Sequence, residues 1–333
     1  MPSNRPVTVV VDAVGGDFAP DRILDGITRA LAANPTVRII VTGPASVVEP
    51  FAAASKGRVE AVATTQVIEM GEHPAAAVRS KKDSSIVVAA RLVREKRADA
   101  FFSAGSTGAC MAAATLVMGR IKGVSRPAIA TVLPTAGPPC VLLDVGANAD
   151  CKPENLLQFA EMGEAYAEVV LGVAVPRVAL LNIGEEPTKG SVLAQEAYVL
   201  LSEKVASFTG NIEGRDVLEG VADVIVTDGF TGNVALKLLE GTSKVLLGQV
   251  KEAMTNTTVT KLAAAVLKPA MVRLKERLDP DTYGGAPLLG VDGVCIIGHG
   301  SSGPVAVENA IKVAVAAIEG DLTGRIAKAV ASN

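Results

Sequence analysis

Short glycine-rich segments with small polar or acidic residues recur along the chain, each directly after an apolar run. Glycine lets backbone N–H groups approach a ligand closely. The first turn of a following helix adds unpaired N–H groups and partial positive charge, which suits an anion such as phosphate. The segments are DAVGGD (12–17), SAGSTGA (103–109), DVGAN (144–148), NIGEEPTKG (182–190), TDGFTGN (227–233) and GHGSSG (298–303).

Residues 184–191 come close to the phosphate-binding P-loop, in which Gly-Lys-Ser/Thr follows a glycine after four residues. Here Lys189 precedes Gly190 instead of following it, and Glu185 and Glu186 would repel a polyphosphate. A dinucleotide site is not supported either, because no Gly-x-Gly-x-x-Gly motif follows an expected strand with an acidic partner. A single phosphate that contacts Lys189 fits better, and a solvated lysine at a helix start is the alternative.

His299 lies between two glycines, where it could act as an acid or base or could bond to the backbone of a turn; the turn is the favoured interpretation. Ser301 and Ser302 precede Pro304 and an apolar run, which is typical of helix capping. They do not form Gly-x-Ser-x-Gly, and no Asp or His partner follows from spacing, so a serine nucleophile is not expected.

The composition excludes several classes of protein. A net charge of −3 and a pI of about 5.6 argue against a nucleic-acid-binding surface. The cysteines (Cys110, Cys140, Cys151 and Cys295) are scattered without a Cys-x-x-Cys pair, and only His73 joins His299, so we expect reduced thiols and no metal site. No signal peptide is expected, because the first apolar run is short and ends in an aspartate.

Apolar β-branched runs alternate with helical patterns, which predicts a doubly wound, mostly parallel α/β/α sandwich over residues 1–333. Since the carboxyl ends of parallel strands share one edge, the glycine-rich segments are expected to converge there. The expected strands are 7–12, 37–43, a short one near 59, 99–105, 128–134, 140–146, 177–184, 222–229 and 293–300. The expected helices are 20–34, one from 45, 83–97, 106–118, 153–171 and 190–207.

Residues 233–278 break this rhythm and predict two long helices separated near TNTTVT. The second helix carries an apolar stripe with basic residues beside it, as interfacial helices do. A helix that packs in a dimer is equally compatible with this pattern. No apolar stretch reaches membrane-spanning length.

The order of these motifs closely resembles the PlsX family, the acyl-[acyl-carrier-protein]:phosphate acyltransferases of bacterial phospholipid synthesis. The resemblance covers nearly the whole chain, and Val14, where the family more often has Met, is a departure without consequence. The matching segments, besides those quoted above, are VRSKKDSS (78–85), LLDVGANADCKPENLLQFAEMG (142–163), PRVALLNIGEEPTKG (176–190), GNIEGRDV (210–217), ADVIVTDGFTGNVALK (222–237) and YGGAPLLGVDG (283–293).

The resemblance implies a fold related to phosphotransacetylases and isopropylmalate dehydrogenases, a homodimer, and no cofactor. The implied reaction moves a fatty acyl group from acyl carrier protein to inorganic phosphate. It also implies a cytoplasmic protein at the membrane periphery, near the glycerol-3-phosphate acyltransferase that uses the product. The helical pair at 233–278 resembles the part of the family that reaches the bilayer.

The resemblance also implies roles for particular residues. Those assigned to catalysis are Lys189, Asn148, Asp228 and His299. Those assigned to substrate binding are Gly15, Gly16, Asp17, Ser106, Thr107, Gly108, Asn182, Glu186, Asn233, Ser301 and Ser302. The basic cluster of Arg79, Lys81 and Lys82, which on its own suggests solvated surface, is assigned to carrier-protein docking. The residues assigned to membrane contact are Leu262, Val266, Leu267 and Met271.

Three other functions stay open. A phosphotransacetylase would use acyl-coenzyme A instead of the acyl carrier protein. A β-decarboxylating dehydrogenase of the same fold would need an acidic metal cluster, which the sequence does not show. A lipid-regulatory or scaffold protein at the membrane would not need so many polar segments after strands.

Overall fold

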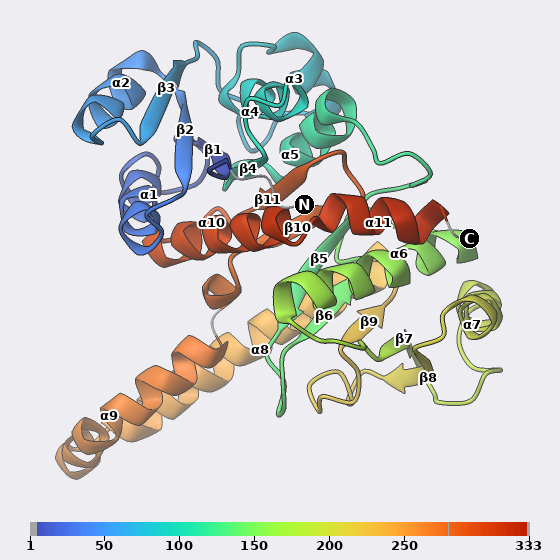
Figure 1. Cartoon of the computed structure of the whole chain (residues 1–333). Helices are drawn as coiled ribbons and strands as arrows, with labels where there is room; N and C mark the ends of the chain where they lie inside the picture. The colour runs from blue at the N-terminus through green and yellow to red at the C-terminus, as the bar shows by residue number, and fades with distance from the viewer. Residues whose placement is uncertain (1–4, 279, 332–333) are drawn as a thin grey trace.

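A twisted β-sheet of eleven strands forms the centre of the computed structural model, which describes residues 5–278 and 280–331 (Figure 1). The strands are β1 Thr8–Asp12, β2 Arg38–Gly43, β3 Val59–Ala63, β4 Ala100–Ser103, β5 Ala128–Leu133, β6 Cys140–Leu143, β7 Val178–Asn182, β8 Phe208–Glu213, β9 Val224–Val226, β10 Ala286–Leu289 and β11 Val294–Ile297. Their order across the sheet is β3-β2-β1-β4-β11-β10-β5-β6-β9-β7-β8.

The strands form two parallel groups that run in opposite directions. β1, β2, β3, β4 and β11 are parallel to one another, and so are β6, β7, β8 and β9. Between the groups, the pairs β11–β10, β10–β5 and β5–β6 are antiparallel. Three reversals leave the second group pointing opposite to the first within the sheet. The prediction of a mostly parallel sheet is confirmed, but the prediction that all glycine-rich segments leave one edge is wrong.

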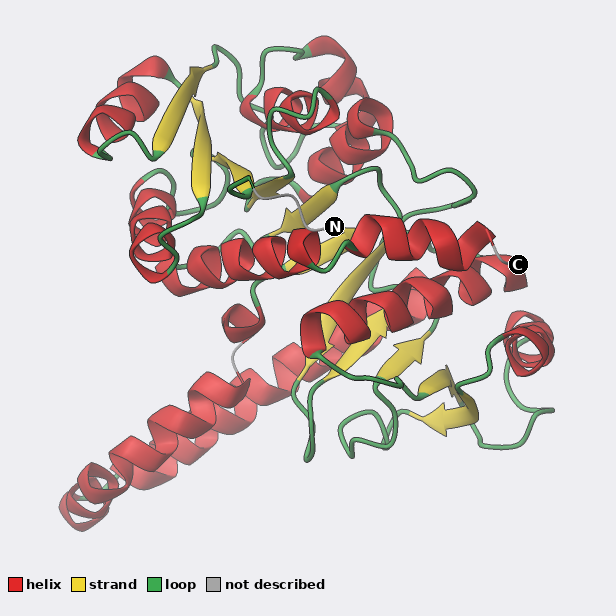
Figure 2. Cartoon of the chain, viewed as in Figure 1, coloured by secondary structure: helices red, strands yellow, loops and turns green. Residues whose placement is uncertain are grey.

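Helices cover both faces of the sheet, as expected for an α/β/α sandwich (Figure 2). In β1, Val9 and Val11 pack on one face and Val10 packs on the other, because successive side chains of a strand alternate. The first face carries α1 Asp21–Ala33, α2 Ala45–Ala54, α6 Pro153–Tyr166, α7 Val192–Lys204, α10 Pro304–Glu319 and α11 Leu322–Ala331. The second face carries α3 Pro74–Ser80, α4 Ser85–Arg94, α5 Thr107–Ala113 and the start of α8 Gly229–Thr255.

α8 and α9 Thr258–Leu278 form a long helical pair that projects from the body (Figure 1). They meet near the predicted break, and the pair begins a few residues before the expected Asn233. Leu236 and Leu239 of α8 pack on the sheet, whereas side chains farther along, such as Val245 and Leu262, are exposed. No helix within the described ranges is long and apolar enough to cross a membrane.

Several elements differ from the expected ones. α3, β8 and β10 were not expected, and both β8 and β10 contain a residue that is rare inside strands, Gly210 and Pro287. The helices expected over 106–118 and 153–171 end in π-helical turns, Ala114–Met118 and Ala167–Leu171. A short 3-10 turn, Pro280–Tyr283, leads into β10.

Candidate functional site

The segments after β1, β4 and β11 form a first loop cluster, defined as residues 12–17, 103–108 and 298–302. β4 pairs with both β1 and β11, so the three segments leave the sheet side by side. The Asp17 N–H donates to the Gly300 carbonyl at 2.7 Å, and the Gly298 N–H donates to the Ser103 carbonyl at 2.8 Å. These bonds hold the three segments as one unit.

Asp12 is the buried centre of the first loop cluster. Its carboxylate accepts from Ser103 Oγ at 2.8 Å and from the Val14 N–H at 3.1 Å, and Ser103 Oγ accepts in turn from the Gly105 N–H at 3.0 Å. Burial raises the pKa of the Asp12 carboxyl, and these hydrogen bonds oppose that shift. Gly15 must be glycine, because a Cβ there would lie 2.7 Å from both Asp12 Oδ2 and the Gly105 nitrogen.

α5 begins inside the first loop cluster. Ser106 caps this helix, and its Oγ accepts from the Ala109 N–H at 3.4 Å. Ser106 is buried, Thr107 is exposed, and Gly108 packs so closely on Pro74 that a side chain would clash. The first N–H groups of a helix have no acceptor within it, so this turn presents donors at the cluster.

His299 and Ser301 are exposed members of the first loop cluster. His299 Nδ1 lies 2.7 Å from Ser301 Oγ and 3.3 Å from the Ser301 nitrogen, which donates to it. The Ser302 N–H donates to the His299 carbonyl at 2.9 Å, and Ser302 is buried. The favoured interpretation of His299 as a residue that bonds the backbone of its turn is therefore confirmed for one ring nitrogen. The other nitrogen makes no bond within the loop.

The segments after β6, β7 and β9 form a second loop cluster, defined as residues 144–148, 182–190 and 227–233. Asp144, which is fully buried, organises its first segment. Its carboxylate accepts from the N–H groups of Gly146, Ala147 and Asn148 at 2.7 to 3.2 Å, and from the Ile129 N–H at 3.0 Å. Burial raises the pKa of the Asp144 carboxyl against the effect of these bonds.

Asn148 has no side-chain donor left for a ligand. Its Nδ2 donates to the Pro127 carbonyl at 2.8 Å and to Asp144 Oδ2 at 2.9 Å, and both partners can only accept. The amide orientation is thereby fixed, so Oδ1 is the group that Asn148 can offer to a ligand. Asn148 can accept a hydrogen bond from a substrate but cannot donate one to phosphate.

Lys189 lies on an exposed turn that Asn182 holds. Asn182 Nδ2 donates to the Lys189 carbonyl at 3.1 Å, and Gly190 has φ +87° with no room for a Cβ beside Asn182 Oδ1. The Lys189 stem packs on Gly184. The exposed Glu186 accepts from the Lys189 N–H at 3.0 Å through its backbone carbonyl. Within the described residues the Lys189 ammonium makes no ion pair and can contact an anion.

Asp228 and Asn233 flank the start of α8. Asp228 caps the helix, accepting from the Thr231 N–H at 2.9 Å and from Thr231 Oγ1 at 2.7 Å. Its carboxylate thus occupies the helix start that would otherwise attract an anion. Asn233 is exposed and faces Gly146 of the neighbouring segment. The Gly229 N–H donates to the Asn148 carbonyl at 2.8 Å, which links the two segments.

The residues assigned to catalysis therefore fall into two clusters. His299 lies in the first, and Lys189, Asn148 and Asp228 lie in the second, on strand groups of opposite direction. No hydrogen bond joins the two clusters across the part of the chain that the structure describes. The sequence reasoning missed Asp12 and Asp144, although a single acidic residue that ends a wholly apolar strand is a visible signal.

In the basic cluster of Arg79, Lys81 and Lys82, the Lys81 ammonium is engaged by neighbouring groups. Lys81 Nζ is 2.6 Å from Glu72 and 2.8 Å from the Val67 carbonyl, and its hydrogen bond lowers the pKa of Glu72. Arg79 and Lys82 are exposed. α3, which carries Arg79, packs against α5, the helix that begins in the first loop cluster.

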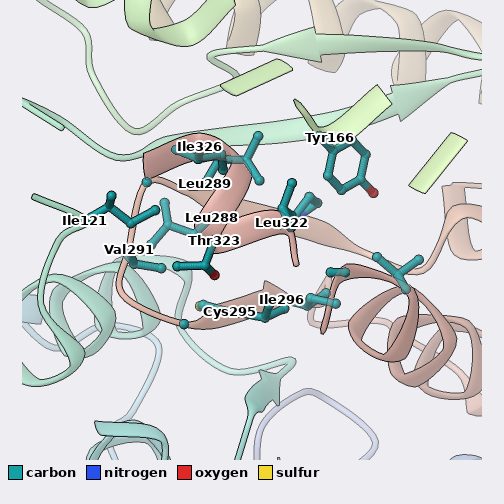
Figure 3. A pocket seen from close by; sticks show the side chains of 16 residues that line it. Ile121, Tyr166, Leu288, Leu289, Val291, Cys295, Ile296, Leu322, Thr323 and Ile326 are labelled. Atoms are coloured by element: carbon teal, nitrogen blue, oxygen red, sulfur yellow. The ribbon is translucent and has the colours of Figure 1, made fainter. Parts of the chain in front are cut away.

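A small pocket of about 10 Å³ lies away from both clusters, between β10, β11 and α11 (Figure 3). Its lining is almost entirely apolar, and the buried Tyr166 hydroxyl at its side has no hydrogen-bond partner within the described residues. The cavity is too small for a substrate, since it has room for about one water molecule. The described residues also contain no group of side chains suited to a metal ion.

The fold is that of the phosphotransacetylases. The chain is similar to a phosphotransacetylase from Streptococcus pyogenes (TM-score 0.61, 15% identity, 94% of each chain). It is similar to EutD phosphotransacetylase from Staphylococcus aureus (TM-score 0.59, 18% identity, 94% of each chain). The predicted relation to phosphotransacetylases is therefore confirmed for the fold.

The chain belongs to the family described as fatty acid synthesis protein, whose model matches residues 7–325. It is 51% identical to a phosphate acyltransferase of Heliobacterium modesticaldum, over 96% of this chain and 98% of that one. It is 50% identical to a phosphate acyltransferase of Desulfitobacterium hafniense, over 96% of each. The resemblance to the PlsX family is confirmed, and the chain is an acyltransferase of fatty acid and phospholipid synthesis.

Proposed function

We propose that the protein transfers a fatty acyl group from acyl carrier protein to inorganic phosphate, giving acyl phosphate. The observation that carries the proposal is about half identity to phosphate acyltransferases along nearly the whole chain. The loop clusters, rich in backbone donors, agree with a phosphate-dependent transfer.

The chemistry needs little acid or base assistance. Phosphate is substantially dianionic at neutral pH and attacks the thioester directly. The leaving thiol has an ordinary pKa of roughly 8.5, so it departs without a strong acid. What the enzyme must supply is orientation of two electron-rich groups and hydrogen bonds to the developing oxyanion.

The two loop clusters offer different groups to a ligand. The first cluster offers neutral donors, the Ser106 hydroxyl, the first turn of α5 and the His299 ring. The second offers the unpaired cation of Lys189, which suits phosphate, and the acceptor oxygen of Asn148. Asp228 acts as a helix cap in this scheme instead of a catalytic base.

The direct test uses a long-chain acyl carrier protein with phosphate and follows both acyl phosphate and free carrier thiol. Formation of both products only when phosphate is present supports the proposal. The fold likeness to phosphotransacetylases favours one other candidate, transfer from acyl-coenzyme A. Side-by-side values of kcat/KM for the two thioesters separate them, and a clear preference for coenzyme A would contradict the carrier-protein assignment.

The family resemblance and two surface features support our proposals for partners and location. Arg79 and Lys82 are exposed cations, which suits an acidic carrier protein. On α9, Leu262 and Val266 are 70% and 81% exposed, which favours burial in a bilayer or against a second copy. We place the protein in the cytoplasm, as a homodimer at the membrane periphery beside the acyltransferase that consumes acyl phosphate.

A further inference from the structure

Two hydrogen-bond donors of Ser301 converge on the same nitrogen of His299. The Ser301 backbone nitrogen is 3.3 Å from Nδ1, and the Ser301 Oγ is 2.7 Å from it. A backbone N–H can only donate, so Nδ1 accepts and carries no proton. The hydroxyl then donates as well. A neutral ring holds its single proton on the other nitrogen, Nε2.

Backbone hydrogen bonds hold the loop that carries His299 from several sides, so the backbone position from which its ring extends is fixed. The Ser302 N–H donates to the His299 carbonyl, and the Asp17 N–H donates to the carbonyl of Gly300. On the other side of His299, the Gly298 N–H donates to the Ser103 carbonyl. The ring itself is exposed, so Nε2–H can reach a ligand at the first loop cluster.

We propose that Ser301 is a positioning residue that holds His299 as the Nε2–H tautomer, which donates to the oxyanion of the acyl-transfer step. This inference rests on the proposed function. A phosphate oxygen attacks the thioester carbon, and the carbonyl electrons move onto oxygen beside Nε2–H. The C–O bond to phosphate persists and the C–S bond breaks. The proton that hydrogen phosphate carried ends on the thiol through solvent.

His299 keeps its charge throughout this step, because it acts as a donor and not as a base. A general base would need the free lone pair to face phosphate. That lone pair belongs to Nδ1 and is already directed at Ser301. Assigning the proton to Nε2 therefore makes His299 a hydrogen-bond donor in this step and not a general base.

The tautomer can be measured without any assay of activity. The chain has only His73 and His299, so two imidazole spin systems are expected in a long-range ¹H–¹⁵N spectrum. His73→Gln assigns them by removing one. At about pH 8.5, roughly two units above the ordinary imidazole pKa, the nitrogen shifts report which ring nitrogen carries the proton. We expect protonated Nε2 and unprotonated Nδ1 for His299.

Ser301→Ala tests the positioning role. The hydroxyl donor is lost, so a population with Nδ1–H should appear in the spectrum. The kcat should fall by about tenfold with KM for phosphate little changed, against about 100-fold for loss of the donor itself in His299→Ala. Ser301→Thr keeps a hydroxyl and should restore both the spectrum and kcat. Ser202→Ala, which removes an exposed hydroxyl from α7, is the matched control.

Protonation at Nδ1 in the unmodified protein would overturn the proposal, and so would an unchanged kcat in Ser301→Ala. The proposed function and the positioning role of Ser301 can be contradicted separately. If no acyl phosphate forms with any thioester, the proposed function is wrong even when the expected tautomer is found. If acyl phosphate forms and the tautomer is the opposite one, the role of Ser301 alone is wrong.

Discussion

At the scale of single residues, the loop clusters depend on two buried carboxylates. Asp12 and Asp144 each end an apolar strand region and gather the backbone N–H groups of the glycine-rich segment that follows. The sequence predicted the turn role of His299, whose Nδ1 accepts from the Ser301 N–H. It could not predict that Asn148 has both amide protons committed, because this depends on the carbonyl of Pro127, the residue before β5.

Lys189 gives the sharpest single-residue test. Lys189→Ala should lower kcat/KM for phosphate by about 100-fold, because a charge-assisted contact with the anion is lost. The free energy of unfolding should change by less than about 0.5 kcal/mol, since the side chain is exposed. Steady-state kinetics and urea unfolding measure the two quantities.

The matched control for that variant is Lys204→Ala, which removes an exposed lysine from the opposite end of the helix that follows Lys189. It should leave kcat/KM unchanged. Near-normal turnover in Lys189→Ala would mean that this lysine is only a solvated cation at a helix start.

At the scale of elements, the pattern of apolar runs predicted most strands and helices but not the directions of the strands. β10 has only four residues and contains Pro287, so its sequence carries little strand signal. Its presence between β11 and β5 adds two of the three reversals. The sequence therefore predicted a sheet with ligand-binding ends but could not predict that these ends belong to two opposed groups.

Arg177 and Asp223 join the starts of β7 and β9, and their pairing should appear in the pH dependence of stability. Arg177 donates to both carboxylate oxygens at 3.0 Å, and its hydrogen bonds lower the pKa of Asp223. Because the pKa of Asp223 is lower in the folded protein than in the unfolded one, the pair stabilises the fold at pH values above the unfolded-state pKa. This stabilisation is lost as the pH falls through the folded-state pKa. The stabilisation should therefore be constant near neutrality and decline below about pH 3.9.

Asp223→Asn should lower the free energy of unfolding at neutral pH by about 2 kcal/mol, because a charge-assisted pair becomes a neutral one. The difference in the free energy of unfolding between this variant and the unmodified protein should become smaller on acidification toward about pH 3. Urea unfolding at a series of pH values measures it. A difference that stays constant over this range would show that the pair is not linked to protonation of Asp223.

At the scale of the whole molecule, the sequence indicated a solvated basic cluster and a long helical pair with an apolar stripe, and both contain exposed residues. Arg79 and Lys82 are exposed, and the helical pair projects from the body (Figure 1). The sequence did not reveal that Lys81 is engaged by Glu72, because these side chains meet only after α3 forms.

Carrier-protein docking should depend on salt through the exposed cations. Arg79→Ala with Lys82→Ala should raise KM for the acyl carrier protein by about tenfold at low salt and weaken its salt dependence. A short acyl thioester without the carrier should show no change. The control pair is Lys204→Ala with Lys251→Ala, which removes the same charge elsewhere. An equal salt response of both substrates in the unmodified protein would exclude this surface.

Membrane contact should depend on the exposed apolar residues of α9. Leu262→Gln with Val266→Gln should reduce cosedimentation with anionic phospholipid vesicles by at least about tenfold, because two apolar side chains are lost from the interface. Leu238→Gln on α8, 70% exposed and nearer the sheet, is the control. Unchanged vesicle binding with dissociation of the dimer in sedimentation equilibrium would assign this surface to a second copy instead.

α8 runs unbroken from the segment that carries Asp228 to the far end of the helical pair. Its 27 residues make a rod about 40 Å long. Whatever grips the outer end of this rod also sets the tilt of its inner end, because a helix resists bending over that length. The proposed contact of the outer end with a lipid surface would therefore also set the orientation of Asn233.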